Sequence, residues 1–209
     1  DRYGVHLPEE ESAEPDPEFR EREGVYHALR FAGLFFFRQL KESPEAEEAR
    51  AYLERRGYDR AVIRKFGLGF SPPGGEAVLK AALREGIPEE YLHKADLIKP
   101  SQRGEGWYDT FRGRLMFPIF NPSGKVIAFA GRVTGNQKAA KYINSAQTLV
   151  YNKSEVVYGV NFSRNEIRRQ EEVILVEGYT DVITLAQHGI ANTVASAGTA
   201  LTPQQIRVL

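Results

Sequence analysis

The sequence of 209 residues contains no cysteine, one methionine and one tryptophan. Without cysteine the chain has no disulfide, no thiolate nucleophile and no cysteine-ligated zinc. Its four histidines are scattered, without the spacing of metal ligands. No run approaches the roughly 20 apolar residues of a membrane-spanning helix, and no targeting segment is visible. These absences indicate a globular chain of one or two domains without zinc, and we expect a cytoplasmic protein with no membrane partner.

The net charge of zero conceals an uneven distribution of charged residues. Residues 112–170 contain ten basic and two acidic residues, whereas residues 1–56 contain 14 acidic and nine basic ones. The basic excess favours a polyanionic partner, although a solvated basic face has the same composition. Arginine supplies 19 of the 28 basic residues, and its planar guanidinium matches phosphate geometry better than lysine does.

The first half of the chain is expected to be helical. Residues 1–16 are acidic and contain proline, as in a loose lead-in. Asp16 and Pro17 form a helix start. Apolar residues at helical spacing follow to about residue 41, namely Val25, Ala28, Leu29, Ala32, Phe36 and Leu40. Further helices are expected at 44–56, 59–67, 75–85 and 88–93, so that residues 17–95 form a helical region.

The pattern changes to β-structure near residue 112. Residues 115–120 and 125–131 are short β-prone runs, and Asn121-Pro122-Ser123-Gly124 between them fits a type I turn. We expect a β-rich region over 112–170: a hairpin first, then a loop-rich stretch over 134–155 and a helix that ends at about residue 170.

The end of the chain alternates between strand and helix. Val173–Val176 is a continuous apolar run, as in a strand buried on both faces. A helix over 180–188, a second buried strand over 192–196 and a helix that starts at Thr202 follow. This βαβα order predicts parallel strands joined by a right-handed crossover. The expected fold class is therefore α/β.

Two carboxylates lie where an open α/β sheet binds ligands, beyond the carboxyl ends of its strands. Glu177 follows the first strand, and Asp181 lies one helical turn later, so both can face the same space. Residues 196–199 leave the neighbouring strand at the equivalent end. Paired carboxylates suit a hard cation such as Mg²⁺. The alternative is that they only cap the helix that starts near Thr180.

The basic stretch has a pattern of its own. Arg112 and Arg114 alternate on the first hairpin strand and are expected to share a face, with Arg132 nearby at the end of the second strand. Lys141 and Lys153 follow in polar loops. Cations interleaved with aromatic rings suit single-stranded nucleic acid, because cations contact phosphates and rings stack on bases.

The aromatic residues beside these cations have two interpretations. Tyr142 and Tyr151 either stack on bases or pack inside the protein, and the roles of Trp107 and Tyr108 stay open.

Five short motifs stand in order along the chain. Residues 111–119 read FRGRLMFPI, residues 124–132 read GKVIAFAGR and residues 141–145 read KYINS; the last two motifs are EGYTDV at 177–182 and ASAGTALT at 195–202. Together with residues 52–71, they resemble the RNA-polymerase core of bacterial DnaG-type primases, and EGYTDV resembles the first motif of the TOPRIM domain. The resemblance covers about residues 20–209.

The resemblance implies an enzyme that makes short RNA primers on a single-stranded DNA template from ribonucleoside triphosphates. It implies an α+β N-terminal subdomain over 17–170 and the start of a Rossmann-like TOPRIM domain over 171–209. Glu177 and Asp181 would be catalytic acids that bind Mg²⁺ or Mn²⁺. The residues implied to bind nucleic acid or nucleotide are Arg112, Arg114, Arg132, Lys141, Tyr142, Asn144 and Lys153.

The chain departs from the family pattern at both ends. The family carries an N-terminal zinc ribbon, which a chain without cysteine cannot form. Its TOPRIM metal site needs a D-x-D pair about 40 residues after the glutamate, and this chain ends 32 residues after Glu177. The domain that binds the replicative helicase is also beyond the chain, so we expect this stretch to be catalytically incomplete by itself. Smaller departures, at Ala130, Ala140 and Ala197, remove no charge.

Two other functions remain as alternatives. Another TOPRIM enzyme, a topoisomerase or a nuclease, would share EGYTDV but not FRGRLMFPI and KYINS, and a topoisomerase would need a transesterifying tyrosine. A non-catalytic module that binds single-stranded DNA would use the basic stretch alone. Primer synthesis from ribonucleotides separates these readings.

Overall fold

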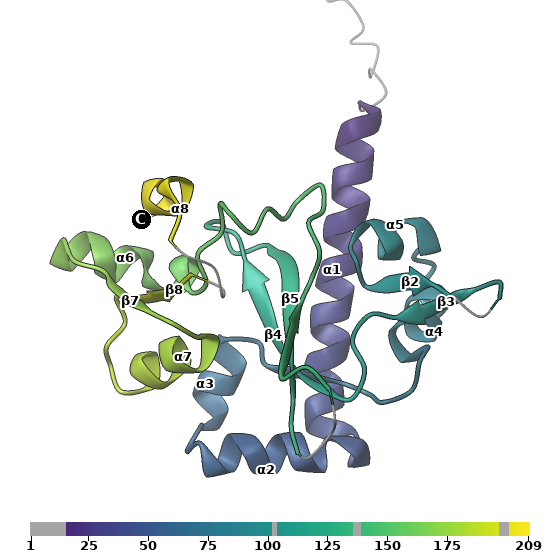
Figure 1. Cartoon of the computed structure of the whole chain (residues 1–209), viewed down its shortest axis with the longest axis horizontal. Helices are drawn as coiled ribbons and strands as arrows, with labels where there is room; N and C mark the ends of the chain where they lie inside the picture. Colours follow the sequence, from purple (N-terminus) through teal and green to yellow (C-terminus); the bar gives the residue numbers. More distant parts are fainter. Residues whose placement is uncertain (1–15, 102–103, 136–138, 197–200) are drawn as a thin grey trace, which may run out of the picture.

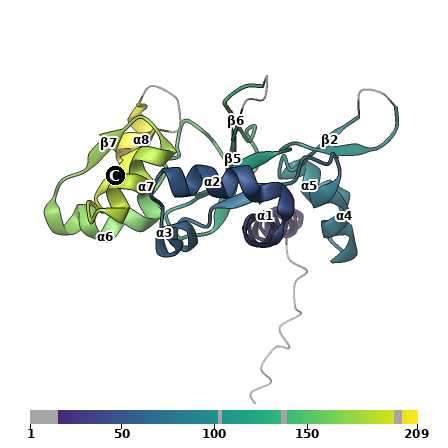
Figure 2. The same ribbon diagram turned by 90° about the horizontal axis from the view of Figure 1, so that it is seen from below.

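The computed structural model describes residues 16–101, 104–135, 139–196 and 201–209. Residues 1–15 of the expected lead-in over 1–16 and most of the expected exit loop at 196–199 lie outside the described residues. Figures 1 and 2 show the C-terminal helices and strands on one side of the molecule and a small hairpin with two helices on the other. A long helix and an antiparallel sheet lie between them. No helix in the described part of the chain is long and apolar enough to cross a membrane.

The long helix α1 (Pro17–Glu42) begins and ends as its sequence predicts. The Asp16 carboxylate accepts a hydrogen bond from the Glu18 amide at 3.1 Å, and Pro17 occupies the first turn. The predicted apolar stripe is buried, and the Phe36 ring meets Phe129 of the sheet edge-on, with ring centroids 5.3 Å apart. Burial of this stripe fixes α1 against the sheet.

Four of the other expected helices are present, with ends that differ by a few residues. They are α2 (Glu47–Arg55, after the 3-10 turn Pro44–Ala46), α3 (Arg60–Lys65), α4 (Ala77–Arg84) and α5 (Glu89–Lys94). Asp59 caps α3, because its carboxylate accepts the Val62 amide at 2.7 Å.

The predicted hairpin forms the centre of a four-stranded antiparallel sheet. Strands β4 (Arg114–Phe120) and β5 (Val126–Val133) pair across the predicted turn, in which the Gly124 amide donates to the Asn121 carbonyl at 2.9 Å. The sheet order is β1-β4-β5-β6, with β1 at Gly69–Ser71 and β6 at Tyr142–Asn144. A separate hairpin joins β2 (Ile98–Pro100) to β3 (Trp107–Asp109).

The short strands correct two expectations. β1 interrupts the region expected to be helical, and β6 lies in the stretch expected to be loops. Each has three residues, too few to show an alternating pattern. They become strands because each pairs with a long strand of the predicted hairpin.

The C-terminal elements confirm the predicted alternation. They are α6 (Val160–Gln170), β7 (Ile174–Val176), α7 (Tyr179–Gln187), β8 (Thr193–Ala195) and α8 (Pro203–Val208), and β7 pairs with β8 in parallel. The expectation that β7 is buried on both faces is wrong: Leu175 is 44% exposed. Within the described residues β7 pairs only with β8, so its outer edge and one face stay uncovered. The α/β class of the chain is confirmed.

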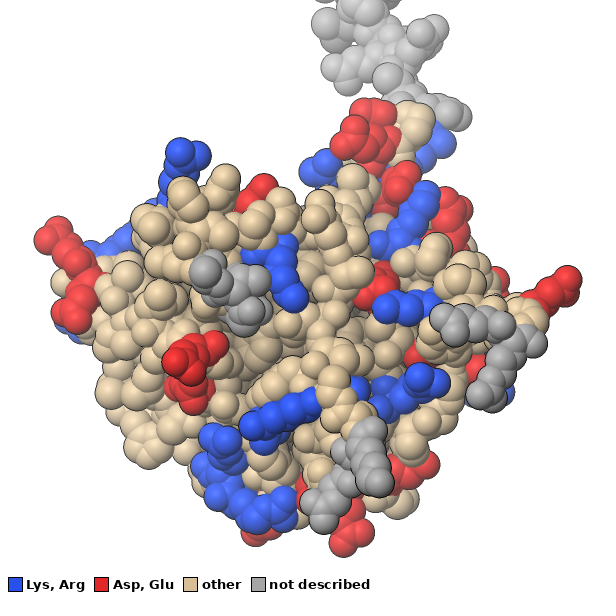
Figure 3. Space-filling view, in the orientation of Figure 1, with Lys and Arg blue, Asp and Glu red and all other residues tan. Residues whose placement is uncertain are grey.

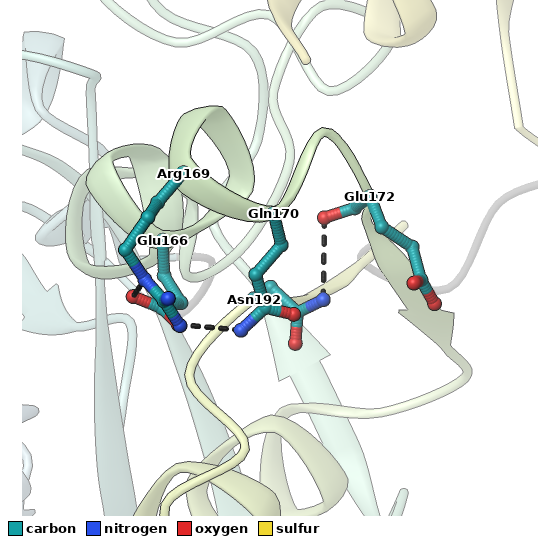
Figure 4. Close-up of polar contacts among 5 residues, drawn as sticks. All are labelled: Glu166, Arg169, Gln170, Glu172 and Asn192. Atoms are coloured by element: carbon teal, nitrogen blue, oxygen red, sulfur yellow. Dashed lines mark hydrogen bonds and ion pairs between the residues drawn. The ribbon is translucent and has the colours of Figure 1, made fainter.

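A polar cluster lies at the end of α6 and at the start of the two parallel strands (Figure 4). The buried Asn192 amide donates to the Glu172 carbonyl at 3.2 Å, which ties the entry of β8 to that of β7. At the end of α6, the Glu166 carboxylate accepts Arg169 Nε at 3.0 Å and also contacts Gln170. Of these contacts, only the bond from Asn192 to Glu172 joins the two strands; the contacts of Glu166 lie within α6.

A continuous hydrophobic cluster joins the sheet to α7. It includes Leu115 and Phe117 of β4 together with Tyr179 and Val182 of α7. The subdomain boundary at residue 170 stays a prediction.

Candidate nucleic-acid interface and acidic site

The two acidic residues lie at the junction of β7 and α7. Glu177 follows β7 directly, Gly178 caps α7, and Asp181 lies in the first turn; both carboxylates are exposed. A Cβ at Gly178 would lie 3.2 Å from Asp181 Oδ2, so the Asp181 side chain turns back toward the start of the helix. Figure 3 shows acidic side chains on the face that includes this junction.

The acidic pair suits a hard cation in donor type but not in number. Carboxylate oxygens are the ligands that Mg²⁺ and Mn²⁺ prefer. Within the described ranges, no three His, Cys, Asp or Glu residues come together in a metal-binding group. Glu177 and Asp181 therefore fit part of a metal site.

Tyr179 connects the acidic junction to the antiparallel sheet. Its hydroxyl donates to Asn144 Oδ1 on β6 at 3.0 Å. Its ring lies 5.9 Å from that of Phe117, 6.0 Å from that of Tyr142 and 4.6 Å from that of Tyr158. Burial raises the pKa of the Tyr179 hydroxyl well above its usual value, so it stays a donor at neutral pH. Tyr179, the first residue of α7, is thus fixed on the sheet.

A second set of contacts holds the other side of α7. The Tyr58 hydroxyl donates to the Thr180 carbonyl at 2.8 Å, and the Gln187 amide donates to the Gly57 carbonyl at 2.8 Å. Gln187 Oε1 accepts the Asp59 amide at 3.0 Å. The turn between α2 and α3 thus braces the helix that carries Asp181.

Arg132 lies between two aromatic rings. Its guanidinium carbon is 4.5 Å from the centre of the Tyr52 ring and 5.2 Å from that of Tyr142. Its Nη1 donates to the Tyr142 hydroxyl at 2.9 Å. Cation–π contacts of this kind hold the guanidinium in one orientation. Arg132 Nε is buried and has no hydrogen-bond partner in the described part of the chain.

Arg112 and Arg114 do not share a strand face, which corrects the expectation. Arg112 precedes β4, and Gly113 between them has φ of 59°, a left-handed conformation that ends the alternation. Arg112 is exposed and lies over the Tyr108 ring at 5.1 Å. Arg114 is 7% exposed and donates to the Gly131 and Ala140 carbonyls at 3.1 and 2.9 Å. Arg114 therefore supports the approach to β6 from inside the protein.

The two lysines lie in different parts of the surface. Lys141 is exposed immediately before β6. Lys153 is half-buried in the loop before α6, and its carbonyl accepts Gln205 Nε2 at 3.1 Å. In Figure 3, basic side chains spread over the lower and central part of the face that carries α2 and the β4–β5 sheet.

The aromatic residues with an open role are mostly packing residues. Tyr151 is 1% exposed, and burial raises the pKa of its hydroxyl to about 12. Trp107 Nε1 donates to Glu89 at 2.9 Å, and its ring lies against His93. Tyr108 is half-exposed beneath Arg112.

The structure thus brings some of the predicted site residues into contact and leaves others apart. Direct contacts connect Arg132, Tyr142, Tyr179 and Asn144, and the last two link to the acidic junction. Sequence reasoning missed Tyr52 and Tyr58, which complete the arginine clamp and the brace of α7. Residues 52–71 could have been linked to the site only through their resemblance to primases, because contacts between residues distant in sequence leave no local pattern.

The fold and this site define a class: an α/β protein with a basic, aromatic-lined surface beside an acidic strand end of the Toprim type. Residues 35–164 match the family described as DNA primase catalytic core, N-terminal domain, and residues 171–209 match the Toprim domain. The chain belongs to the DNA primase catalytic core family.

Known primases resemble the chain over most of its length. The DNA primase of Myxococcus xanthus is 39% identical over 197 residues, which are 94% of this chain and 32% of that protein. The DNA primase of Escherichia coli K12 is 37% identical over 209 residues, covering 99% and 35%. The chain spans about a third of the length of the curated relatives that it matches.

Solved structures agree with this assignment. The RNA polymerase domain of the Mycobacterium tuberculosis primase DnaG superposes with a TM-score of 0.84 at 36% identity, covering 89% of this chain and 60% of that one. A DnaG primase catalytic domain bound to single-stranded DNA superposes with a TM-score of 0.82 at 38% identity, covering 91% and 59%.

Proposed function

We propose that this chain forms part of the catalytic core of a DNA primase, which makes short RNA primers on single-stranded DNA from ribonucleoside triphosphates. The observation that carries the proposal is the contact path from Arg132 through Tyr142 and Tyr179 to the acidic junction. A nucleic acid held at Arg132 would lie close to Glu177. The solved primase with bound single-stranded DNA supports the same partner.

The basic residues would divide the work of binding. Arg132, clamped by two rings, presents a fixed guanidinium to a phosphate of the template or the primer. Exposed Lys141 and Arg112, and Lys153 in the loop before α6, add positive charge along the strand or the incoming nucleotide. Buried Arg114 positions the approach to β6, and Asn144 positions Tyr179.

Glu177 and Asp181 would hold Mg²⁺ or Mn²⁺ together with further oxygen ligands. The bound metal would neutralise charge on the phosphates during nucleotidyl transfer. The chain's own contribution is to fix where Glu177 stands, through Tyr179 and the brace of α7. Two carboxylates supply only part of the roughly six oxygens that such a cation takes, so we propose that the 209-residue chain alone makes no primer. In the longer protein, the replicative helicase would bind through a separate C-terminal domain.

Binding of single-stranded DNA without catalysis is the second candidate, because Arg112 and Lys141 are exposed cations, whereas the junction of β7 and α7 offers two carboxylates. The function of another Toprim enzyme, a topoisomerase or a nuclease, fits this chain less well, because residues 35–164 match the primase core.

Primer synthesis in a longer chain that includes the D-x-D pair tests the proposal. Glu177→Gln should reduce primer synthesis by about 100-fold or more and leave DNA binding intact. Glu172→Gln is the matched control, because this exposed carboxylate points away from the polar cluster in Figure 4. Full activity of Glu177→Gln, or primer synthesis by the 209-residue chain alone, would contradict the proposal.

A further inference from the structure

We infer that the chain carries a second binding site, a pocket for an acidic peptide segment of a partner protein. The pocket lies where the end of α1, the helix α2 and the start of α3 meet, and α2 joins the other two helices in Figures 1 and 2. Its volume is about 800 Å³, enough to hold several side chains. None of the residues assigned above to nucleic acid or metal lines it.

The floor of the pocket is apolar. Leu40 and Leu53 reach it from the hydrophobic core, in which they are 5% and 2% exposed. Phe37 and Ile63 are half-buried and present part of their side chains to the pocket. An apolar side chain of a partner would remove this remaining surface from water, which is favourable.

The rim is strongly basic. It carries Lys41, Arg50, Arg60 and Arg64 against one acid, Glu54. Arg60 and Arg64 lie one turn apart on α3, where like charges repel, and neither they nor Lys41 form an ion pair within the described ranges. An anionic partner would relieve this repulsion.

Arg50 offsets the negative charge at the C-terminal end of α1, where an anion would bind. Its Nη1 donates to the Leu40 and Ser43 carbonyls at 3.0 and 2.8 Å. Carbonyls at a helix C-terminus carry partial negative charge and would repel a carboxylate. Arg50 covers two of them with a cation.

The distribution of charge favours a peptide over a nucleotide. The four cations belong to three helices around the pocket, a spacing that suits carboxylates on successive residues better than one compact triphosphate. Glu54 would repel a phosphate but can accept a backbone amide from a peptide. The expected ligand is therefore an acidic segment with one or two large apolar side chains.

An occupant of this pocket would contact the brace of α7. Tyr58 and Gly57 line the pocket, and the same residues bind Thr180 and Gln187 of α7. A docked partner would thus stabilise the turn that holds the helix of Asp181.

A binding titration tests the inference. The probe is a fluorescein-labelled peptide of about twelve residues that carries five aspartates, one phenylalanine and one leucine. We expect it to bind the chain, and Arg60→Glu combined with Arg64→Glu to weaken binding at least about tenfold. Lys41→Glu, in a different helix, should also weaken it. Arg84→Glu is the matched control, because Arg84 is exposed in the last turn of α4 as Arg64 is in α3. Thermal unfolding confirms that each variant is folded.

Three results would overturn the inference. The first is an equal loss of binding in Arg84→Glu. The second is unchanged binding of a probe whose phenylalanine and leucine are replaced by alanine, which would show that charge alone attracts it. The third is competition by ATP or single-stranded DNA that depends on Arg60 and Arg64, which would assign the pocket to nucleotides.

Discussion

At the scale of single residues, Asp109 shows how one buried carboxylate holds a helix in place. It is 1% exposed at the end of β3, and its oxygens accept the Val78 and Leu79 amides at the start of α4 at 2.8 and 3.1 Å. No residue adjacent to α4 in sequence caps this end with its side chain. The hydrogen bonds therefore attach the β2–β3 hairpin to α4.

Removal of this carboxylate should destabilise the protein. Asp109→Ala leaves two buried amides without an acceptor, and we expect the free energy of unfolding to fall by about 1–3 kcal/mol. Urea denaturation measures the change. Asp59→Ala, which removes the cap of α3 at a more exposed position, should cost less; an equal or smaller loss in Asp109→Ala would contradict the role given to burial.

The same residue predicts a dependence of stability on pH. Burial, the largest influence, raises the folded-state pKa of Asp109, although the hydrogen bonds from the backbone amides at the start of α4 oppose the shift. The folded protein therefore binds a proton at Asp109 more strongly than the unfolded protein does. Protonation of Asp109 thus makes its full contribution to the free energy of unfolding below the unfolded pKa of about 4, and this contribution is lost as pH rises through the folded pKa. As pH increases over this range, the free energy of unfolding of the wild type should decrease relative to that of Asp109→Asn. A difference that stays constant with pH would contradict the shift.

Tyr179 makes a prediction about the link between the sheet and the acidic junction. Tyr179→Phe keeps the packed ring but leaves Asn144 Oδ1 without its donor. We expect a loss of about 0.5–1.5 kcal/mol in the free energy of unfolding, measured by urea denaturation. Tyr26→Phe is the control, since the described residues provide no hydrogen bond to that hydroxyl. Equal stability of Tyr179→Phe and the wild type would show that the hydrogen bond does not hold the junction.

At the scale of elements, the contact between α1 and β1 depends on a missing side chain. A Cβ at Gly69 would lie 2.5 Å from Phe36 Cβ and 2.7 Å from the Phe36 carbonyl carbon. Because backbone atoms are involved, rotation of a side chain cannot relieve the overlap.

Gly69→Ala should therefore push α1 away from β1. We expect it to lower the free energy of unfolding by about 1–3 kcal/mol, with a corresponding fall in melting temperature. Gly74→Ala is the control, because no atom lies within 4 Å of a Cβ there. A neutral Gly69→Ala would show that the helix and the sheet are less tightly packed than the structure indicates.

The elements also show what local pattern reveals. Capping residues and an apolar stripe predict α1, and a turn between two β-prone runs predicts the β4–β5 hairpin, because both signals lie within one element. The three-residue strands β1 and β6 exist only through pairing, so their sequences carry no periodic signal. The exposure of Leu175 was missed for a related reason: an apolar run predicts a strand, but its cover depends on other parts of the chain.

In the candidate site, too, local sequence patterns predict some features and not others. The position of Glu177 and Asp181 at a strand end follows from local alternation of strand and helix. The clamp of Tyr52 and Tyr142 around Arg132 joins α2, β5 and β6, which no local pattern connects. The burial of Arg114 was hidden because a charged residue gives no sign that carbonyls will surround it.

At the scale of the whole molecule, the zero net charge conceals a basic stretch over residues 112–170 and an acidic excess over residues 1–56. We propose that the surface around Arg132 and Lys141 binds single-stranded DNA by its phosphates, whereas Glu177 serves catalysis. The two functions should therefore be separable by mutation in one chain.

The most direct test is fluorescence anisotropy of labelled single-stranded DNA, titrated with the 209-residue chain over a range of salt concentrations. Arg132→Ala and Lys141→Ala should each weaken binding and reduce the slope of log affinity against log salt by about 0.7 for each lost phosphate contact. Glu177→Gln should keep the wild-type slope and bind no more weakly than the wild type, and Arg84→Ala should match the wild type in both. An unchanged slope in both Arg132→Ala and Lys141→Ala, or an equal decrease in Arg84→Ala, would contradict the proposed surface.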